Sequence, residues 1–460
     1  MPEGVVVIGG GPGGYVAALR AAQRGSSVTV VEEASLGGVC LNRGCIPTKS
    51  LLACAEVVNI VREAGTFGVE VPSFSLNYTA MVERKDRIVS QLRKGIDFLF
   101  QKRGVRLVSG HGRLLSRRKV LVEKEGEEPL KLEADAIILA TGSDPLKPPV
   151  FPFDRERVVS GEEALSWREI PPSLLIVGGG VIGVEMASLF SSLGSSVTIV
   201  EMLPRILPGV DEEIGRELSR EFKKRKIRIL TGSPVESLEL TDLNVTAKIS
   251  GGESLTASRA IIALGRVPRS RDLGLEDAGV RTDAKGFVAV NPMMETSVPG
   301  VYAVGDLIGG RLLAHAASHE GLTAAENALG GSEEMDDRAI PNCIFTFPEI
   351  ASVGLSGEEA SEKKLETVTG TFPFRALGKA QAAGKIEGMV KVVALRKSGE
   401  ILGVHLIGAH ATDLVGEALL AVKKRLTLSD VAGAVHPHPT FTEAMMEGAL
   451  SALGIPLHAV

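Results

Sequence analysis

The sequence Val7-Ile-Gly9-Gly-Gly11-Pro-Gly-Gly14 is matched 169 residues later by Ile176-Val-Gly178-Gly-Gly180-Val-Ile-Gly183. The offset is the same downstream, where Gly25-Ser-Ser-Val-Thr-Val-Val-Glu32 recurs as Gly194-Ser-Ser-Val-Thr-Ile-Val-Glu201. Each copy predicts an apolar strand, a glycine turn, a helix rich in Ala, Leu and Val, and a β-branched strand ending in Glu. This order is typical of a βαβ nucleotide-binding unit, so the chain contains two such units.

Three glycines in each copy have the spacing G-x-G-x-x-G. They serve a tight turn, the close approach of a pyrophosphate and close helix packing, with phosphate at a helix N-terminus. The motif alone also occurs in strand-to-helix turns that bind nothing. Glu32 and Glu201, each 18 residues past the last glycine, add a carboxylate for ribose hydroxyls. We therefore expect two dinucleotide sites, with these glycines: Gly9, Gly11 and Gly14 in the first, Gly178, Gly180 and Gly183 in the second.

The acid of the second copy bears on the choice of coenzyme. A carboxylate at the ribose repels a 2′-phosphate, so Glu201 predicts NAD rather than NADP. Arg205 follows four residues later, and a basic residue there could support a phosphate. The favoured interpretation is a surface arginine, because the acid occupies the ribose position.

The length and the later sequence patterns indicate the domain organisation. At roughly 150 residues per domain, 460 residues suggest about three domains. After about Asn342 the pattern changes to short runs typical of an antiparallel sheet, with helical periodicity in 412–424 and 442–453. The predicted fold is α/β, with two Rossmann-like dinucleotide-binding domains and a C-terminal α+β dimerisation domain. We expect the first domain at 1–145, the second at 146–268, a return to the first at 269–339 and the interface domain at 340–460.

Composition excludes several classes of protein. A formal charge of -5 without a long run of either sign makes nucleic acid an unexpected partner. Four cysteines are too few for a secreted disulfide framework, and the N-terminus carries no targeting pattern. No apolar stretch reaches the ~18 residues of a membrane helix without a glycine-rich or charged interruption. A soluble, cytoplasmic protein is expected.

Cys40 and Cys45 form a C-x4-C pair shortly after the first nucleotide unit. In a regular helix five residues rise about 7.5 Å, beyond the ~7 Å limit for bridging Cα atoms, so a disulfide requires an irregular turn. Gly44 and Pro47 permit one, and the following helix N-terminus favours a thiolate at Cys45. Two buried thiols are the alternative; zinc is less favoured because the other two cysteines form no second pair. The position beside a dinucleotide loop favours redox chemistry.

A second group of candidate residues lies near the C-terminus. His436 and His438 each precede proline, which favours extended backbone with both side chains on one side. No third ligand of suitable spacing is nearby, so no metal site is predicted. Thr440-Phe-Thr-Glu443 reads as a capping box, and on the residues alone this structural role is favoured for Glu443.

Taken together, the motifs resemble the pyridine nucleotide-disulfide oxidoreductases over essentially the whole chain. Besides the two glycine motifs, the resemblance rests on these segments: Gly38-Val-Cys40 to Cys45-Ile-Pro-Thr-Lys49, Ala140-Thr141-Gly142-Ser143, Gly265-Arg-Val-Pro268, Ala303-Val-Gly-Asp306, Leu313-Ala314-His-Ala316 and His436-Pro-His-Pro-Thr440.

The resemblance implies FAD in the first unit and NAD in the second. It places Lys49 near flavin N5, paired with Glu185; without it, both would be taken for ordinary helix-face charges. The other cofactor-binding residues that it implies are Asp306 on the ribityl chain, Ala314 through its backbone, Gly112 near the adenine, and Thr141, Gly142 and Gly265.

The resemblance also implies an activity, namely oxidation of protein-bound dihydrolipoamide to lipoamide with NAD. Cys40 and Cys45 would form the redox disulfide, His438 would be the general base, and Glu443 would orient its imidazole. His438 and Glu443 would come from the other subunit of an obligate homodimer, with His436 as a neighbouring helper or structural residue. The implied partner is the lipoyl domain and E2 core of a 2-oxo acid dehydrogenase complex, or a glycine cleavage lipoyl protein.

Three alternatives are weighed against this activity. A glutathione-type reductase prefers NADPH and would replace Glu201 by a smaller residue followed by paired arginines. A mercuric-type reductase would carry a C-terminal cysteine pair, and no cysteine follows Cys343. A non-catalytic flavoprotein scaffold could dispense with Cys40, Cys45 and His438, and the chain has all three.

Overall fold

The structure is a computed structural model that describes residues 3–458. Its first sheet is built around β1 (Glu3–Ile8), which pairs in parallel with β2 (Val28–Glu32) and β6 (Leu130–Leu139). The strand order is β3-β2-β1-β6-β5-β4, and β17 pairs in parallel with β6. Buried Val, Ile and Leu fill β1 and the second half of β6, as expected for strands covered on both faces. The other strands are β3 (Arg106–Ser109), β4 (His111–Ser116), β5 (Lys119–Glu123) and β17 (Val301–Ala303).

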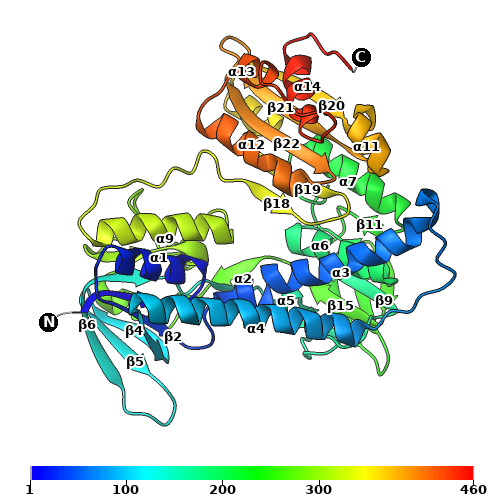
Figure 1. Cartoon of the computed structure of the whole chain (residues 1–460). Coiled ribbons are helices and arrows are strands. Elements are labelled where there is room, and N and C mark those ends of the chain that lie inside the picture. The colour runs from blue at the N-terminus through cyan, green and yellow to red at the C-terminus, as the bar shows by residue number, and fades with distance from the viewer. Residues whose placement is uncertain (1–2, 459–460) are drawn as a thin grey trace.

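Two helices cover one face of this sheet side by side (Figure 1). They are α1 (Pro12–Gln23) and α9 (Ala314–Ala328), from opposite ends of the predicted first domain. Their backbones approach closely because glycines meet at the crossing: a Cβ on Gly321 would lie 2.3 Å from the Gly13 carbonyl oxygen. The return of the chain to the first domain is thus fixed by packing.

The helical segment between β2 and β3 of the first sheet extends across to the second unit (Figure 1). It comprises α2 (Gly38–Arg43), α3 (Cys45–Glu63), η1 (Ala64–Phe67) and α4 (Tyr78–Arg103). Among the described residues, one helical run, 38–67, is long and apolar enough to cross a membrane, by length and composition only. That run is broken at Gly44, and α3 packs against α4 and against α6 of the second unit. Leu51, Ala55 and Val58 of α3 are therefore part of the protein core, whereas Val57 and Ile60 are exposed.

The second sheet is fully parallel, in the order β11-β10-β9-β15-β8. The central β9 (Ser173–Val177), α6 (Val181–Leu193) and β10 (Ser196–Val200) form the second βαβ unit that the repeat predicts. The remaining elements are β8 (Val158–Ser160), α5 (Gly161–Ala164), α7 (Glu212–Lys224), β11 (Arg228–Leu230) and β15 (Arg259–Ile262), with an antiparallel ribbon of β12 (Val235–Leu240), β13 (Val245–Ile249) and β14 (Ser254–Ala257).

The chain enters and leaves this second unit through two antiparallel crossing strands, β7 (Ser143–Pro145) and β16 (Arg266–Pro268). They lie at the boundaries that we predict for the second domain, 146–268. Beyond β16 follow α8 (Leu275–Ala278) and η2 (Gly305–Ile308).

The C-terminal sheet is antiparallel, in the order β18-β19-β22-β21-β20. The helices α12 (Ala411–Lys423) and α14 (Glu443–Ala452) pack on it and match the helical periodicity of the sequence. Ile344, Ile350 and Ile407 share a buried cluster with α3 and the second unit. The other elements are β18 (Asn342–Ile344), β19 (Glu349–Gly354), α10 (Gly357–Glu362), β20 (Thr367–Pro373), η3 (Phe374–Ala376), α11 (Gly378–Ala383), β21 (Gly388–Leu395), β22 (Ile401–Gly408) and α13 (Leu428–Ala432).

Candidate active site

Cys40 and Cys45 are joined by a disulfide, with their Cα atoms 4.7 Å apart. Cys40 belongs to α2, and Cys45 is the first residue of α3. Between them Gly44 leaves helical geometry, with φ −134° and ψ −104°, which brings the two Cα atoms closer than the rise of a regular helix allows. The predicted irregular turn is confirmed.

Lys49 lies one turn beyond Cys45 on α3. Its Nζ contacts both carboxylate oxygens of Glu185, on α6, at 2.8 and 2.9 Å. The buried carboxylate also accepts the backbone N–H of Phe345 at 2.9 Å, and Lys49 Nζ lies 4.3 Å from the centroid of the Phe345 ring. The pair therefore joins the redox segment, the second nucleotide unit and the C-terminal sheet.

The glycines of the two nucleotide motifs differ in what surrounds them. A Cβ on Gly14 would lie 1.9 Å from the Gly9 carbonyl oxygen, and one on Gly183 2.0 Å from the Gly178 carbonyl oxygen. Packing between strand and helix therefore requires these glycines. A Cβ on Gly180, in contrast, would meet no protein atom within 4 Å.

The middle glycines thus face open space at the start of a helix. A Cβ on Gly11 would meet only the Gly38 Cα, at 3.8 Å. Gly11 and Gly180 are the N-caps of α1 and α6, and neither helix has a side-chain cap. The free N–H groups and the missing side chains leave room for a phosphate. Both sites therefore fit a dinucleotide.

Glu32 and Glu201 make equivalent contacts in the two copies. Glu32 accepts the N–H of Gly10 at 2.6 Å and that of Ala34 at 2.8 Å. Glu201 accepts the N–H of Gly179 at 2.6 Å and that of Leu203 at 2.8 Å. Each carboxylate therefore ties the glycine turn to the loop after the second strand.

Arg205 is half-buried rather than a plain surface arginine. It donates to the Pro208 carbonyl oxygen at 3.1 Å, and its Nη1 is buried without a hydrogen bond. This contact is with the chain's own backbone, so it assigns Arg205 no role at the second nucleotide site.

The remaining predicted cofactor residues lie in strand β4, at two helix starts and in loops of the two units. Asp306, in η2, accepts the hydroxyl of Ser143. Ala314 begins α9, which has no side-chain cap, and Gly112 packs on the sheet, where a Cβ would lie 2.9 Å from Ile8. Thr141 uses its hydroxyl to hold the Arg269 carbonyl at 2.7 Å. Gly142 and Gly265 have φ of +76° and +108° with open space at the Cβ position.

His438 and Glu443 are in contact, with Nδ1 2.9 Å from Oε1. Glu443 Oε2 accepts the Thr440 N–H at 2.8 Å, so the carboxylate makes both predicted contacts. The Thr440 bond is the carboxylate half of the predicted capping box. The other half does not form as predicted, because the N-cap of α14 is Thr442 and the Thr440 hydroxyl donates to the Pro437 carbonyl oxygen at 2.7 Å. The His438 side chain is 75% exposed, whereas that of His436 is 6% exposed.

His436 binds elsewhere. Its Nε2 lies 2.9 Å from Glu417 Oε1 and its Nδ1 3.0 Å from the Ala434 carbonyl oxygen. The two histidines, expected on one side, therefore have separate partners. Within residues 3–458 we find no cluster of three or more His, Cys, Asp or Glu that could hold a metal ion.

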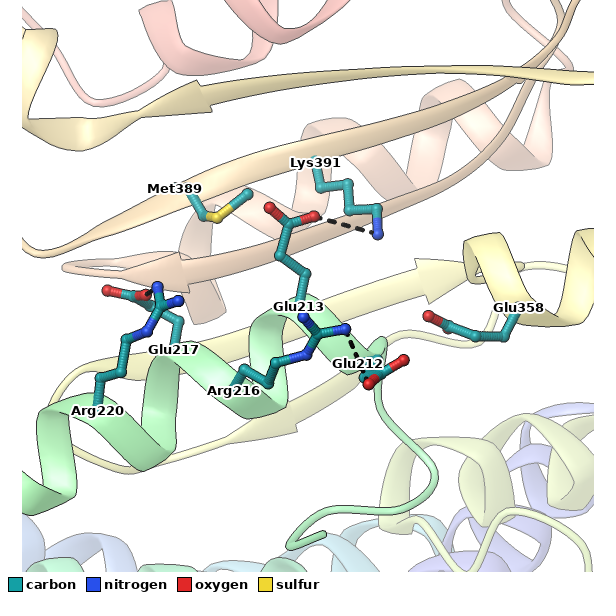
Figure 2. A pocket seen from close by; sticks show the side chains of 8 residues that line it. All are labelled: Glu212, Glu213, Arg216, Glu217, Arg220, Glu358, Met389 and Lys391. Carbon is teal, nitrogen blue, oxygen red and sulfur yellow. Dashed lines mark hydrogen bonds and ion pairs between the residues drawn. The ribbon is translucent and has the colours of Figure 1, made fainter.

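A cavity of roughly 210 Å³ lies between α7, α10 and β21 (Figure 2). Its arginines and lysine are paired with acids that also line it: Arg216 with Glu212, Arg220 with Glu217 and Lys391 with Glu213. None of the predicted site residues lines it. We interpret it as an ion-paired seam between the second unit and the C-terminal sheet.

Comparison with known proteins identifies the family. Residues 3–321 match the family described as pyridine nucleotide-disulphide oxidoreductase, and residues 340–449 match its dimerisation domain. The chain belongs to the pyridine nucleotide-disulphide oxidoreductases. These oxidoreductases use FAD and NAD, as the sequence led us to expect, and the dimerisation domain supports a homodimer.

Relatives within the pyridine nucleotide-disulphide oxidoreductases match over their full length. The chain is 43% identical to a dihydrolipoyl dehydrogenase of Chlamydia trachomatis, over 98% of this chain and 97% of the relative. It is 42% identical to a dihydrolipoyl dehydrogenase of Bacillus subtilis, over 99% and 100%.

Solved structures confirm the fold. LpdA from Mycobacterium tuberculosis superposes with a TM-score of 0.92 at 27% identity, covering 97% of this chain and 99% of that one. The HOCl-induced flavoprotein disulfide reductase RclA from Escherichia coli gives a TM-score of 0.88 at 25% identity, covering 98% and 99%.

Proposed function

We propose that this chain oxidises protein-bound dihydrolipoamide to lipoamide with NAD. The observation that carries the proposal is the Cys40–Cys45 disulfide at the start of α3, in a chain about as long as its relatives. The relatives named dihydrolipoyl dehydrogenase support the choice of dithiol.

The cofactors would be held by the residues that the geometry makes suitable. Gly9, Gly11, Gly14 and Glu32 would hold FAD at the start of α1, with further contacts from Gly112, Thr141, Gly142, Asp306 and Ala314. Gly178, Gly180, Gly183 and Glu201 would hold NAD at the start of α6, next to Gly265. Glu201 supports NAD over NADP, because its carboxylate would repel a 2′-phosphate.

The proton and sulfur steps use this chain's own side chains. His438 of the partner subunit takes a proton from one substrate thiol, and the thiolate attacks the Cys40 sulfur. The Cys40–Cys45 bond breaks, and Cys45 leaves as a thiolate at the N-terminus of α3, which favours the negative charge. The second substrate thiol then attacks the substrate sulfur of the mixed disulfide, and its proton passes to the departing Cys40 sulfur while the first proton stays on His438. Cys40 is released and lipoamide is complete.

This exchange leaves two electrons in the Cys40–Cys45 dithiol. FAD, held by the first unit, would supply the chemistry that takes up these electrons and passes them to NAD as hydride. Lys49 and Glu185 keep the start of α3 fixed against α6 during the exchange, since their ion pair spans the two helices.

A site shared between subunits is supported by the arrangement of one chain. Figure 1 shows α14 near the C-terminal end of the molecule, well apart from α2, which carries Cys40. The exposed His438 at the entrance to α14 is therefore available to a second subunit. A homodimer would complete two such sites.

We also propose which proteins deliver the substrate. The substrate would arrive on a lipoyl domain, either from the E2 core of a 2-oxo acid dehydrogenase complex or from a glycine cleavage lipoyl protein. The cytoplasmic location, the four domain boundaries and the individual residue roles are proposed in the same sense.

A steady-state assay tests the function directly. The purified FAD-bound dimer is given free dihydrolipoamide with NAD or NADP in parallel, and glutathione disulfide with NADPH as the alternative substrate pair. We expect turnover with dihydrolipoamide and NAD at least tenfold above the other combinations. Preferential glutathione reduction, or no disulfide chemistry at all, would contradict the proposal.

A further inference from the structure

Arg266 is the first residue of the crossing strand β16, where the chain leaves the second nucleotide unit. Its side chain is 13% exposed and contacts three different parts of the protein. An arginine suits such a place because its planar guanidinium carries five donors, whereas a lysine offers one point charge.

Two of its contacts close the crossing between the domains. Arg266 Nε donates to Ser143 Oγ at 2.6 Å, and Nη2 donates to the Ser143 carbonyl oxygen at 2.8 Å. Ser143 is on β7, the strand by which the chain enters the second unit. The entering and leaving strands are thus joined by side-chain bonds as well as by their pairing.

The third contact reaches into the second unit. Arg266 Nη1 donates to Glu162 Oε1 at 2.8 Å, and both side chains are largely buried. Glu162 lies on α5, whose start is fixed by a capping box between Ser160 and Glu163. The position of Arg266 is therefore set by a rigid part of the second unit.

The same guanidinium faces the first domain. Its Nε lies 3.6 Å from Asp306 Oδ2, the oxygen that accepts the Ser143 hydroxyl. Glu162 has one further partner, Arg43, at 3.7 Å, but Arg43 is 50% exposed and such pairs contribute little. The closely packed set is Arg266, Ser143, Glu162 and Asp306.

We propose that Arg266 is a positioning residue, which holds the second nucleotide unit in register with the Asp306 loop of the first. This role rests on the proposed function for its place in turnover, but it requires only that FAD and NAD occupy their units. The transfer between the two cofactors depends on the angle between the domains. The exchange at Cys40 and Cys45 takes place on α2 and α3, and α3 is held to α6 by the Lys49–Glu185 pair, which is separate from the contacts of Arg266.

The test compares the two half-reactions in the FAD-bound dimer. Stopped-flow absorbance follows flavin reduction by NADH and, separately, by dihydrolipoamide. For Arg266→Lys we expect NADH-driven reduction to slow at least tenfold and dithiol-driven reduction to change less than threefold. FAD content and the visible flavin spectrum should remain those of the parent. Arg228→Lys, the matched control, makes the same change at an exposed arginine of the second unit that pairs with Glu253, and it should change both rates less than twofold.

Three results would overturn the proposal: an unchanged NADH rate, equal slowing of both half-reactions, or an equal effect of Arg228→Lys. Should Arg266→Lys fail to retain FAD, Glu162→Gln decides, because it keeps an acceptor for Arg266 and removes the charge. It should slow the NADH reaction alone, and an unchanged rate overturns the proposal. If the parent protein does not oxidise dihydrolipoamide, the proposed function fails, while the NADH reaction still tests the role of Arg266.

Discussion

Glu443 holds the His438 imidazole with one carboxylate oxygen and the Thr440 backbone N–H with the other. Burial raises the pKa of Glu443, but the bonds from His438 and Thr440 together lower it by more. The pKa of Glu443 therefore lies below its usual value. The carboxylate is therefore ionised at neutral pH and favours a proton on His438 Nδ1. Nε2 is left as an acceptor, the state that a general base requires.

Replacing the proposed base gives the first prediction. His438→Gln should lower turnover of dihydrolipoamide by about 10²- to 10⁴-fold, the usual contribution of general-base catalysis. Flavin reduction by NADH should be nearly unchanged, because it does not involve the thiol proton. Steady-state and stopped-flow assays measure the two effects.

His436→Gln is the matched control, since His436 is buried beside Glu417. His436→Gln should lower the thermal unfolding midpoint, whereas its turnover should fall far less than that of His438→Gln. Parent-like turnover of His438→Gln would show that His438 is not the base.

The cysteine pair gives the second prediction. Cys45→Ser should abolish dihydrolipoamide turnover, because Cys40 then has no disulfide bond for the thiolate to break. The protein should remain yellow, with FAD bound, because the glycine turn of the first unit is untouched. Cys54→Ser changes a free cysteine and should keep parent activity. Full activity of Cys45→Ser would exclude the disulfide mechanism.

The repeat made both nucleotide units predictable, because each depends on residues close together in the sequence. The glycine turns, the strands on both sides and the acids Glu32 and Glu201 all lie within about 30 residues of one another. The irregular turn at Gly44 was predictable for the same reason: helix geometry alone forbids a bridge over that spacing.

Contacts over long sequence distances could not be predicted in this way. Arg266 meets Ser143 and Glu162 only because β7 and β16 pair, and nothing near Arg266 in the sequence signals it. Glu185 was singled out by resemblance, but its bond to the Phe345 N–H depends on how the C-terminal sheet docks. The separation of His436 from His438 likewise depends on α12, which supplies Glu417.

A third prediction concerns stability at acid pH. His405, on β22, is buried beside Lys391 on β21. Lys391 Nζ lies 2.8 Å from Oδ2 of Asp211, the N-cap residue of α7. Burial lowers the pKa of His405 below its usual value, against the opposing effects of the Leu355 carbonyl and Asp211. Its Nδ1 has no hydrogen-bond partner. The folded protein therefore keeps this histidine neutral.

The direction in which pH changes the free energy of unfolding follows from proton uptake on unfolding. Below the usual histidine pKa of about 6.5, the unfolded chain binds a proton that folded His405 does not. The stability from this group is present above that pH and is lost as pH falls, at up to about 1.4 kcal/mol per pH unit. His405→Gln should flatten the decline of the unfolding midpoint between about pH 6.5 and 5.5. An identical decline in both proteins would show that other groups cause it.

The last prediction separates ligand binding from packing within one glycine motif. Gly183→Ala places a Cβ 2.0 Å from the Gly178 carbonyl oxygen, so strand and helix must move apart and the thermal unfolding midpoint should fall. Gly180→Ala meets no protein atom, and its φ of −74° suits alanine. Its unfolding midpoint should stay within about 1 °C of the parent's, or rise slightly, because alanine reduces the entropy of the unfolded chain. The added methyl group should nevertheless obstruct the pyrophosphate, so KM for NAD should rise at least tenfold. Equal KM values for Gly180→Ala and the parent would mean that NAD does not approach the chain at this glycine, however well the rest of the unit matches its pattern.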